Sequence, residues 1–161
     1  ERNKPDGCLT LVRKHVPVVG CTPYAYRDGT GHIALAVHMA GLTVINTHIK
    51  WDKSGGETHV GVGQAERLVE MVRDMQHVII LSDCNDRPGG PVRRVLEDAG
   101  FTGLQMATPT ALINGDPVAL DIIAARGSTT AYLPDSPISY MPTAEHPSDH
   151  LVVRAQVRYP A

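Results

Sequence analysis

A short polar stretch of this 161-residue sequence places a carboxylate and an amide directly after an apolar run, at Asp83 and Asn85. Residues 78–81 are rich in β-branched types and too few for a helix, so they predict a buried strand. Because side chains alternate along a strand, Asp83 and Asn85 point the same way if the strand geometry persists. A buried strand that delivers such groups to its carboxyl end is a common way to build a site. The alternative is that Asp83 caps a turn and Asn85 starts a loop.

Polar groups also lie at the ends of, or inside, three other predicted strands, over 42–49, 118–124 and 151–157. If these strands share one sheet, their polar groups gather at one place. Carboxylates, amides and imidazoles together suit a hard divalent cation with a histidine base, which is the chemistry of metal-assisted attack on phosphate. The alternatives are a core Asp bonded to backbone and surface histidines. The residues concerned are Asn46 and His48, Asp121, and Asp149 with His150.

The elements that must position these groups alternate between strands and helices, which predicts one α/β domain over residues 1–161. An amphipathic helix is expected over 64–75, and a short one over 91–99, with Pro91 at its first position and Gly100 after its end. We expect 101–117 to be irregular and 126–147 to form a long loop. The remaining strands are expected over 8–12 and 32–39, with an edge strand over 16–19.

Composition limits the classes of protein. A net charge of −2 gives no overall basic field for nucleic acid, and 4% aromatic residues argue against a base-stacking surface. The three cysteines form neither a zinc pattern nor a disulfide framework, which slightly favours a cytoplasmic, reducing location. No segment has the apolar length to span a membrane, and no signal peptide is visible.

Five short motifs occur in an order that resembles the exonuclease/endonuclease/phosphatase superfamily of deoxyribonuclease-like phosphoesterases, including its deadenylase-like and bacterial members. Each motif is weak alone, but together they extend over nearly the whole chain. Ser82 and Cys84 stand where the superfamily usually has Gly and an aromatic residue. The motifs are Lys4-Pro5-Asp6-Gly7-Cys8, Asn46-Thr47-His48, Leu81-Ser82-Asp83-Cys84-Asn85, Leu120-Asp121 and Ser148-Asp149-His150.

The resemblance implies a role for each candidate residue. Asp83 would orient and activate the attacking water, while His150, oriented by Asp121, would stabilise the phosphoryl oxygen or transfer a proton. His48 would contact the scissile phosphate. The remaining implied roles are substrate binding by Asn85 and Asn46, and metal binding by Asp149.

The resemblance also implies a two-sheet β-sandwich flanked by helices. The superfamily begins with a strand and a helix that carries a metal-binding Glu, and no counterpart precedes Asp6. The domain is therefore expected to be incomplete at its amino end, with a missing segment or a second chain completing it. The predicted function is Mg²⁺- or Mn²⁺-dependent hydrolysis of a phosphoester in nucleic acid, a phospholipid headgroup or an inositol phosphate. The alternative is a catalytically incompetent half-domain that acts as a binding or partner-completed module.

Overall fold

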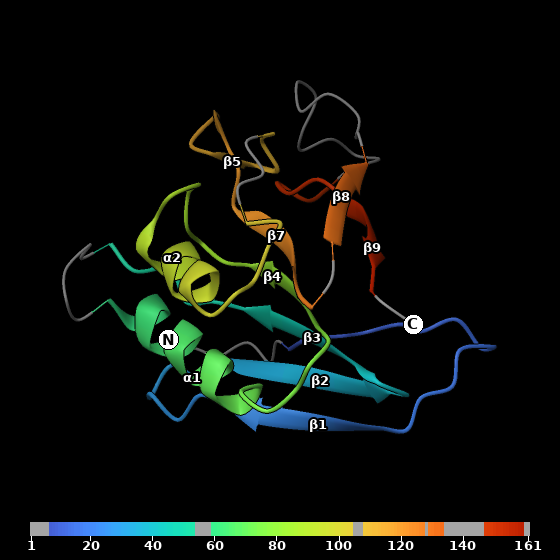
Figure 1. Cartoon of the computed structure of the whole chain (residues 1–161). Helices are drawn as coiled ribbons and strands as arrows, with labels where there is room; N and C mark the ends of the chain where they lie inside the picture. Colours follow the sequence, from blue (N-terminus) through green and yellow to red (C-terminus); the bar gives the residue numbers. More distant parts are fainter. Residues whose placement is uncertain (1–6, 54–58, 105–107, 128, 134–146, 160–161) are drawn as a thin grey trace.

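A five-stranded sheet forms the centre of the protein (Figure 1), in a computed structural model that describes residues 7–53, 59–104, 108–127, 129–133 and 147–159. Its strand order is β1-β2-β3-β4-β7, and all neighbours are antiparallel except β3 and β4. The strands are β1 (Gly20–Ala25), β2 (Ile33–Met39), β3 (Leu42–His48), β4 (Val78–Asp83) and β7 (Asp121–Arg126).

Local sequence explains the first half of this sheet. β2 and β3 form a hairpin closed by Ala40 and Gly41, and the φ of +71° at Gly41 is a conformation that glycine adopts without steric cost. The chain then crosses over through a helix, so that β4 returns parallel to β3. As a result the carboxyl ends of β3 and β4 meet at the same edge of the sheet, where the antiparallel β7 begins.

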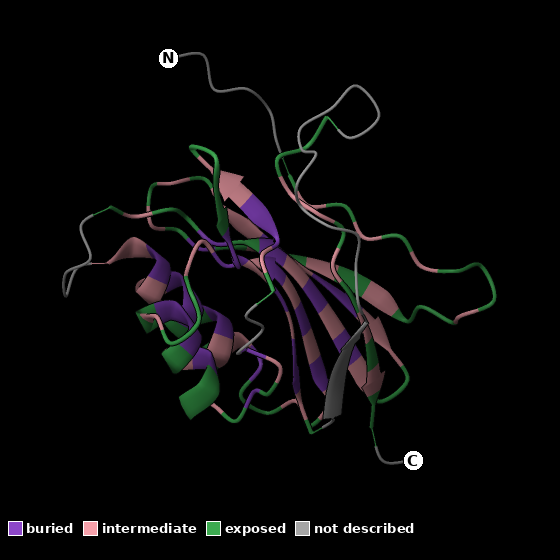
Figure 2. Ribbon diagram, turned by 90° about the horizontal axis from the view of Figure 1, so that it is seen from above, coloured by how far each residue is buried: buried purple, intermediate pink, exposed green. Residues whose placement is uncertain are grey.

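Two helices, α1 (Val60–Met71) and α2 (Pro91–Asp98), cover one face of the sheet (Figures 1 and 2). The main hydrophobic core lies between them and the sheet, because alternate strand residues such as Ile45 and Ile80 face Leu68 and Leu96 of the helices. No helix among the described residues is long and apolar enough to cross a membrane.

Two small sheets complete the described part. β5 (Ala111–Ile113) pairs with β6 (Asp116–Val118), and β8 (Thr129–Leu133) pairs with β9 (Arg154–Arg158) next to β7. The predicted α/β fold with separate sheets and flanking helices is confirmed.

Several predicted boundaries were wrong. Residues 8–12 form no ladder, although their exposure alternates, and the first strand is β1 rather than 16–19. Helix α1 begins and ends four residues before the predicted limits. It begins early because His59 caps its amino end, where the ring Nδ1 accepts a hydrogen bond from Val62 N. The hairpin of β5 and β6 lies in the stretch predicted to be irregular, and β8 lies within the predicted loop. Asp6 and residues 134–146 lie outside the described residues.

Candidate active site

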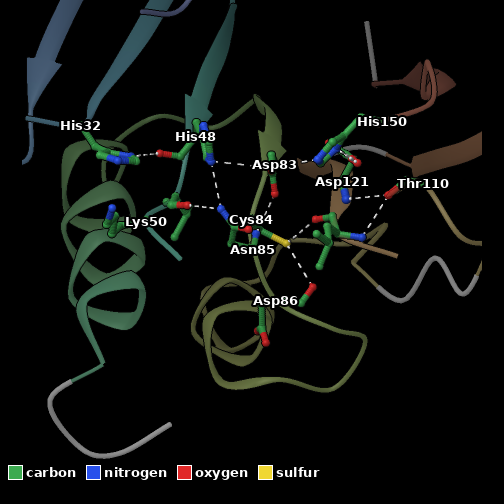
Figure 3. A network of polar contacts seen from close by, with 12 residues as sticks. His32, His48, Lys50, Asp83, Cys84, Asn85, Asp86, Thr110, Asp121 and His150 are labelled. Atoms are coloured by element: carbon green, nitrogen blue, oxygen red, sulfur yellow. Dashed lines mark hydrogen bonds and ion pairs between the residues drawn. The ribbon is translucent and has the colours of Figure 1, made fainter. Parts of the chain in front are cut away.

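Three of the predicted residues are direct neighbours in the sheet. His48 is the last residue of β3 and is in register with Asp83, the last residue of β4; Asp83 is in turn in register with Asp121, the first residue of β7. The sequence predicted Asp121 inside a strand over 118–124, and this was wrong: Asp121 is the first residue of β7. Figure 3 shows the three side chains at one edge of the sheet, with His150 beside Asp121.

Asp83 occupies the middle of this group. Its Oδ1 accepts a hydrogen bond from the main-chain N of Asn85 at 2.9 Å, while its Oδ2 lies 3.6 Å from His48 Nε2 and 3.7 Å from His150 Nε2. Desolvation by burial raises the pKa of Asp83, against the opposing effect of the Asn85 hydrogen bond, and the nearby Asp121 raises it further. One carboxylate oxygen thus faces two imidazole rings and carries a raised proton affinity.

His150 and Asp121 form a hydrogen-bonded pair. His150 Nδ1 donates to Asp121 Oδ2 at 2.8 Å, and both side chains are partly buried. This hydrogen bond raises the pKa of His150 to about 9, against desolvation, and the charges of Asp121, Asp83 and Asp149 raise it further. The ring is consequently an imidazolium at neutral pH, with Nε2 directed toward Asp83.

An irregular segment brings His150 to Asp121. Residues 110–112 pair with 149–151 through hydrogen bonds from Leu112 N to Asp149 O (3.0 Å) and from Leu151 N to Thr110 O (2.7 Å). The buried hydroxyl of Thr110 also accepts from the N–H groups of Leu120 and Asp121, at 3.0 Å each. Thr110 therefore holds the start of β7 and the His150 segment together, and no sequence motif had pointed to it.

His48 is held by Asn85 through an unusual backbone turn. Asn85 adopts a φ of +47°, and its Nδ2 donates both to His48 Nε2 (2.9 Å) and to Ile49 O (2.8 Å). Exchanging the amide's N and O would set two oxygens against each other at Ile49, so the amide orientation is fixed. His48 Nε2 must then be the acceptor, and in this arrangement both amide hydrogens of Asn85 are already in use.

The side chains of the other two predicted residues make no hydrogen bond to this group in the described part of the chain. Asn46 lies two residues before His48, but its amide donates to Leu9 O at 2.8 Å and so anchors the extended segment 8–12 to the sheet. Asp149 is exposed beside His150, and its main-chain carbonyl is bonded to Leu112.

A buried arginine, which sequence reasoning missed, supports the loops behind the site. Arg93 of α2 is fully enclosed; its Nε donates to Asp86 O (3.1 Å), its Nη1 to Leu104 O and its Nη2 to Ala119 O (2.6 Å). The guanidinium thus links the turn after β4 to the segment before β7. Cys84 adds a contact from its buried Sγ to Leu120 O at 2.8 Å, and burial raises its pKa to about 12, so it is an inert thiol.

One group of described residues has the composition of a metal site. Ligand atoms of Asp83, Asp121 and His150 lie within 4.8 Å of one another. Two carboxylates suit a hard cation, whereas the imidazole suits softer ones. The donor set fits a divalent ion. Such an ion would compete with the hydrogen that His150 Nδ1 donates to Asp121.

Comparisons with known proteins bear on the fold. No family model and no curated sequence matches the chain. Among solved structures it is similar to an endonuclease/exonuclease/phosphatase from Bacteroides vulgatus (13% identity, TM-score 0.68, covering 92% of this chain and 68% of that one) and to ANGEL2, a 2′,3′-cyclic phosphatase (11%, 0.68, 88% and 67%). It is also similar to the Bacteroides thetaiotaomicron mannosyl-6-phosphatase Bt3783 (15%, 0.62, 89% and 67%).

The chain therefore has the fold of the exonuclease/endonuclease/phosphatase superfamily, and the resemblance found in its motifs is confirmed at the level of the fold. It spans about two thirds of the length of these structures.

Proposed function

We propose that this chain carries the site of a phosphoester hydrolase in which a water molecule attacks phosphorus with the help of a divalent metal. The observation that carries the proposal is the position of Asp83 Oδ2 between His48 Nε2 and His150 Nε2, at 3.6 and 3.7 Å. An acceptor flanked by two imidazoles can take a proton from water beside groups that bind a phosphate. The names of the similar structures, which include two phosphatases, support the same class of reaction.

Each residue has a role that follows from its contacts. Asp83 accepts a proton from water as the water oxygen bonds to phosphorus and the ester P–O bond breaks. The imidazolium of His150, backed by Asp121, faces a phosphoryl oxygen through Nε2 and is the nearest donor for the leaving oxygen. His48 faces the phosphate from the other side of Asp83, where its Nε2, an acceptor in this structure, takes a hydrogen bond from the attacking water or from a protonated phosphoryl oxygen. Asn85 offers its Oδ1 as an acceptor, and can donate to phosphate only by releasing His48 or Ile49.

We further propose Mg²⁺ or Mn²⁺ as the metal. Within the group formed by Asp83, Asp121 and His150, the two carboxylates would hold the ion while His150 keeps its proton, and the exposed carboxylate of Asp149 next to His150 is the additional ligand predicted from sequence. Bound there, the ion would neutralise charge on the phosphate.

Hydrolysis of synthetic esters tests the proposal. The purified protein is incubated with 4-nitrophenyl phosphate, a monoester, and bis(4-nitrophenyl) phosphate, a diester, each with Mg²⁺, with Mn²⁺ or with excess chelator. A 2′,3′-cyclic nucleotide, mannose 6-phosphate, an inositol phosphate, a short nucleic acid and sphingomyelin extend the panel. We expect turnover of at least one substrate that is lost in chelator and in Asp83→Ala. Turnover undiminished in chelator would rule out the metal, and turnover undiminished in Asp83→Ala would rule out the site.

A second candidate is a module that binds, or that another segment or chain completes, without catalysis by this chain alone. It is supported by exposed aliphatic side chains, among them Leu9 (74% exposed), Leu11 (85%), Val19 (75%) and Val152 (72%). Sedimentation of the purified protein would test it, because a covered apolar surface requires a stable dimer or complex. A monomer that hydrolyses the panel would exclude this candidate.

A further inference from the structure

His32 is the residue before β2, and it contacts His48 although nothing in the motifs pointed to it. Its Nδ1 lies 2.7 Å from the main-chain oxygen of His48. A carbonyl oxygen only accepts, so Nδ1 of His32 must carry the hydrogen. The side chain of His32 thus binds the end of β3 at the point where the regular pairing of β2 with β3 has ended at Ala34 and Thr47.

The ring of His32 also packs against the ring of His48. The two ring centres are 5.3 Å apart, and the planes meet at 73°, which is an edge-to-face arrangement. Figure 3 shows both rings on the β3 side of Asp83. The His32 ring therefore contacts His48 at two places, the main-chain oxygen and the ring.

His48 needs such support because its side chain is 58% exposed. An exposed imidazole on a strand end has several accessible rotamers. In this structure Asn85 binds the Nε2 end of the ring, and His32 packs against the ring and fixes the carbonyl of the same residue. Together these contacts hold Nε2, as an acceptor, 3.6 Å from Asp83.

We propose that His32 is a positioning residue of the active site, which holds the His48 ring so that Nδ1 carries the hydrogen and Nε2 faces Asp83. The inference rests on the proposed function, in which His48 contacts the phosphate. Without His32 the ring turns away from Asn85, and the tautomer with the hydrogen on Nε2, which free imidazole side chains favour, gains population.

Two substitutions separate the contacts of His32. His32→Phe keeps an aromatic ring against His48 but removes the donor. His32→Asn keeps a donor, because its Nδ2 is as many bonds from Cβ as the Nδ1 of His, but removes the ring. His38→Phe is the matched control, since His38 is a half-buried histidine near the other end of β2, where it bridges the hydroxyls of Thr22 and Thr43.

The readouts are the ¹⁵N chemical shifts of the His48 ring in the metal-free protein, and kcat and KM for the best substrate of the panel. We expect unprotonated Nε2 in wild type and in His38→Phe, and a shift toward protonated Nε2 in His32→Phe. Loss of one hydrogen bond should lower kcat about fivefold to tenfold in His32→Phe with a smaller change in KM, and His32→Asn should recover part of it.

The outcomes distinguish this inference from the proposed function. Wild-type ring shifts and kcat in His32→Phe would overturn the positioning role, even if its melting temperature fell as in His38→Phe. If His48→Ala itself kept wild-type turnover, the proposed role of His48 would be wrong, whereas a damaging His48→Ala beside a harmless His32→Phe would overturn the inference about His32 alone.

Discussion

The two histidines that face Asp83 are positioned in different ways. His48 is placed by the sheet itself, because it ends β3 next to Asp83, and a neutral amide from Asn85 completes its contacts. His150 belongs to no strand of the central sheet; it reaches the site through residues 110–112 and is bonded to a carboxylate. One ring is therefore held as a hydrogen-bond acceptor and the other as an imidazolium.

This difference shows how the Asp83 carboxylate can contact a hydrogen-bond acceptor on one side and a positive charge on the other. On the His48 side Asp83 meets a ring whose lone pair is directed inward, and on the His150 side it meets a positive charge. Groups with opposite proton demands on either side of one acceptor are typical of acid–base sites. The His48 side depends on strand pairing, whereas the His150 side depends on polar bonds among irregular segments.

The largest effect is expected from removing the shared carboxylate or the charged ring. His150→Ala and Asp83→Ala should each lower turnover by about 10²- to 10⁴-fold, because each removes a positioned acid–base group. Both side chains lie at the edge of the sheet, outside the main core, so both variants should fold; Asp83→Ala should melt close to wild type, and His150→Ala somewhat lower because it loses the pair with Asp121. Steady-state kinetics together with thermal melts check this, and wild-type turnover in His150→Ala would contradict the account.

Removing the buried guanidinium of Arg93 should lower stability more than the change at Thr110 described below. Arg93→Met removes the guanidinium donor from the carbonyls of Asp86, Leu104 and Ala119, and each buried carbonyl left unpaired costs about 1–3 kcal/mol. Arg94→Met is the control, since Arg94 is exposed and its guanidinium bonds to Gly89 O on the surface. Urea denaturation measures both; equal midpoints for the two variants would show that the buried arginine does not support these loops.

A smaller change should loosen only the link between β7 and the His150 segment. Thr110→Val keeps the shape but leaves the N–H groups of Leu120 and Asp121 without an acceptor, at a cost of about 1–3 kcal/mol. Thr22→Val, which removes one partly buried hydroxyl from His38 on the far strand, is the control. Amide hydrogen exchange should show faster exchange at 120 and 121 in Thr110→Val alone, and unchanged protection there would argue against the link.

The smallest expected change is in the pH profile of turnover. Activity should rise as Asp83 deprotonates, at a pH above the ordinary Asp range because its pKa is raised, and fall as His150 loses its proton near pH 9. Asp121→Asn should move the falling limb toward 6.5, the ordinary His value, since an amide can hold the ring but supplies no charge. Its loss of turnover at neutral pH should be no greater than that of His150→Ala. A falling limb that stays near pH 9 in Asp121→Asn would show that His150 is not the group that sets it.

Sequence reasoning reached the His48 side of the site more fully than the His150 side. Hydrophobic runs and turn residues predicted β2, β3 and β4 to within a residue or two, because each has a regular pattern and close neighbours in the chain. The pairing of Asp83 with His48 then follows from a parallel crossover. The arrangement of His150 on Asp121 was a hypothesis from motif resemblance, since His150 lies 29 residues from Asp121 in the chain and its segment is held by pairing with the still earlier residues 110–112.

The residues that were missed share a physical reason. Thr110, Arg93 and His32 act through side-chain hydrogen bonds to main-chain groups of distant segments. Such bonds have no sequence period, and a threonine or arginine in an irregular stretch or helix resembles an ordinary surface residue. Asp121 was placed inside its strand for a related reason: the apolar run began at Val118, but Thr110 and Arg93 hold 119–120 out of the ladder.

The protonation of His150 tests the central claim most directly, because the account requires an imidazolium backed by Asp121 beside Asp83. NMR titration of its ring in metal-free protein should give a pKa near 9 in wild type and a lower value in Asp121→Asn. Since the folded value exceeds the unfolded 6.5, the pair's contribution to the free energy of unfolding is complete below pH 6.5 and is lost as pH rises through about 9. A wild-type pKa at 6.5, unchanged in Asp121→Asn, would contradict the account.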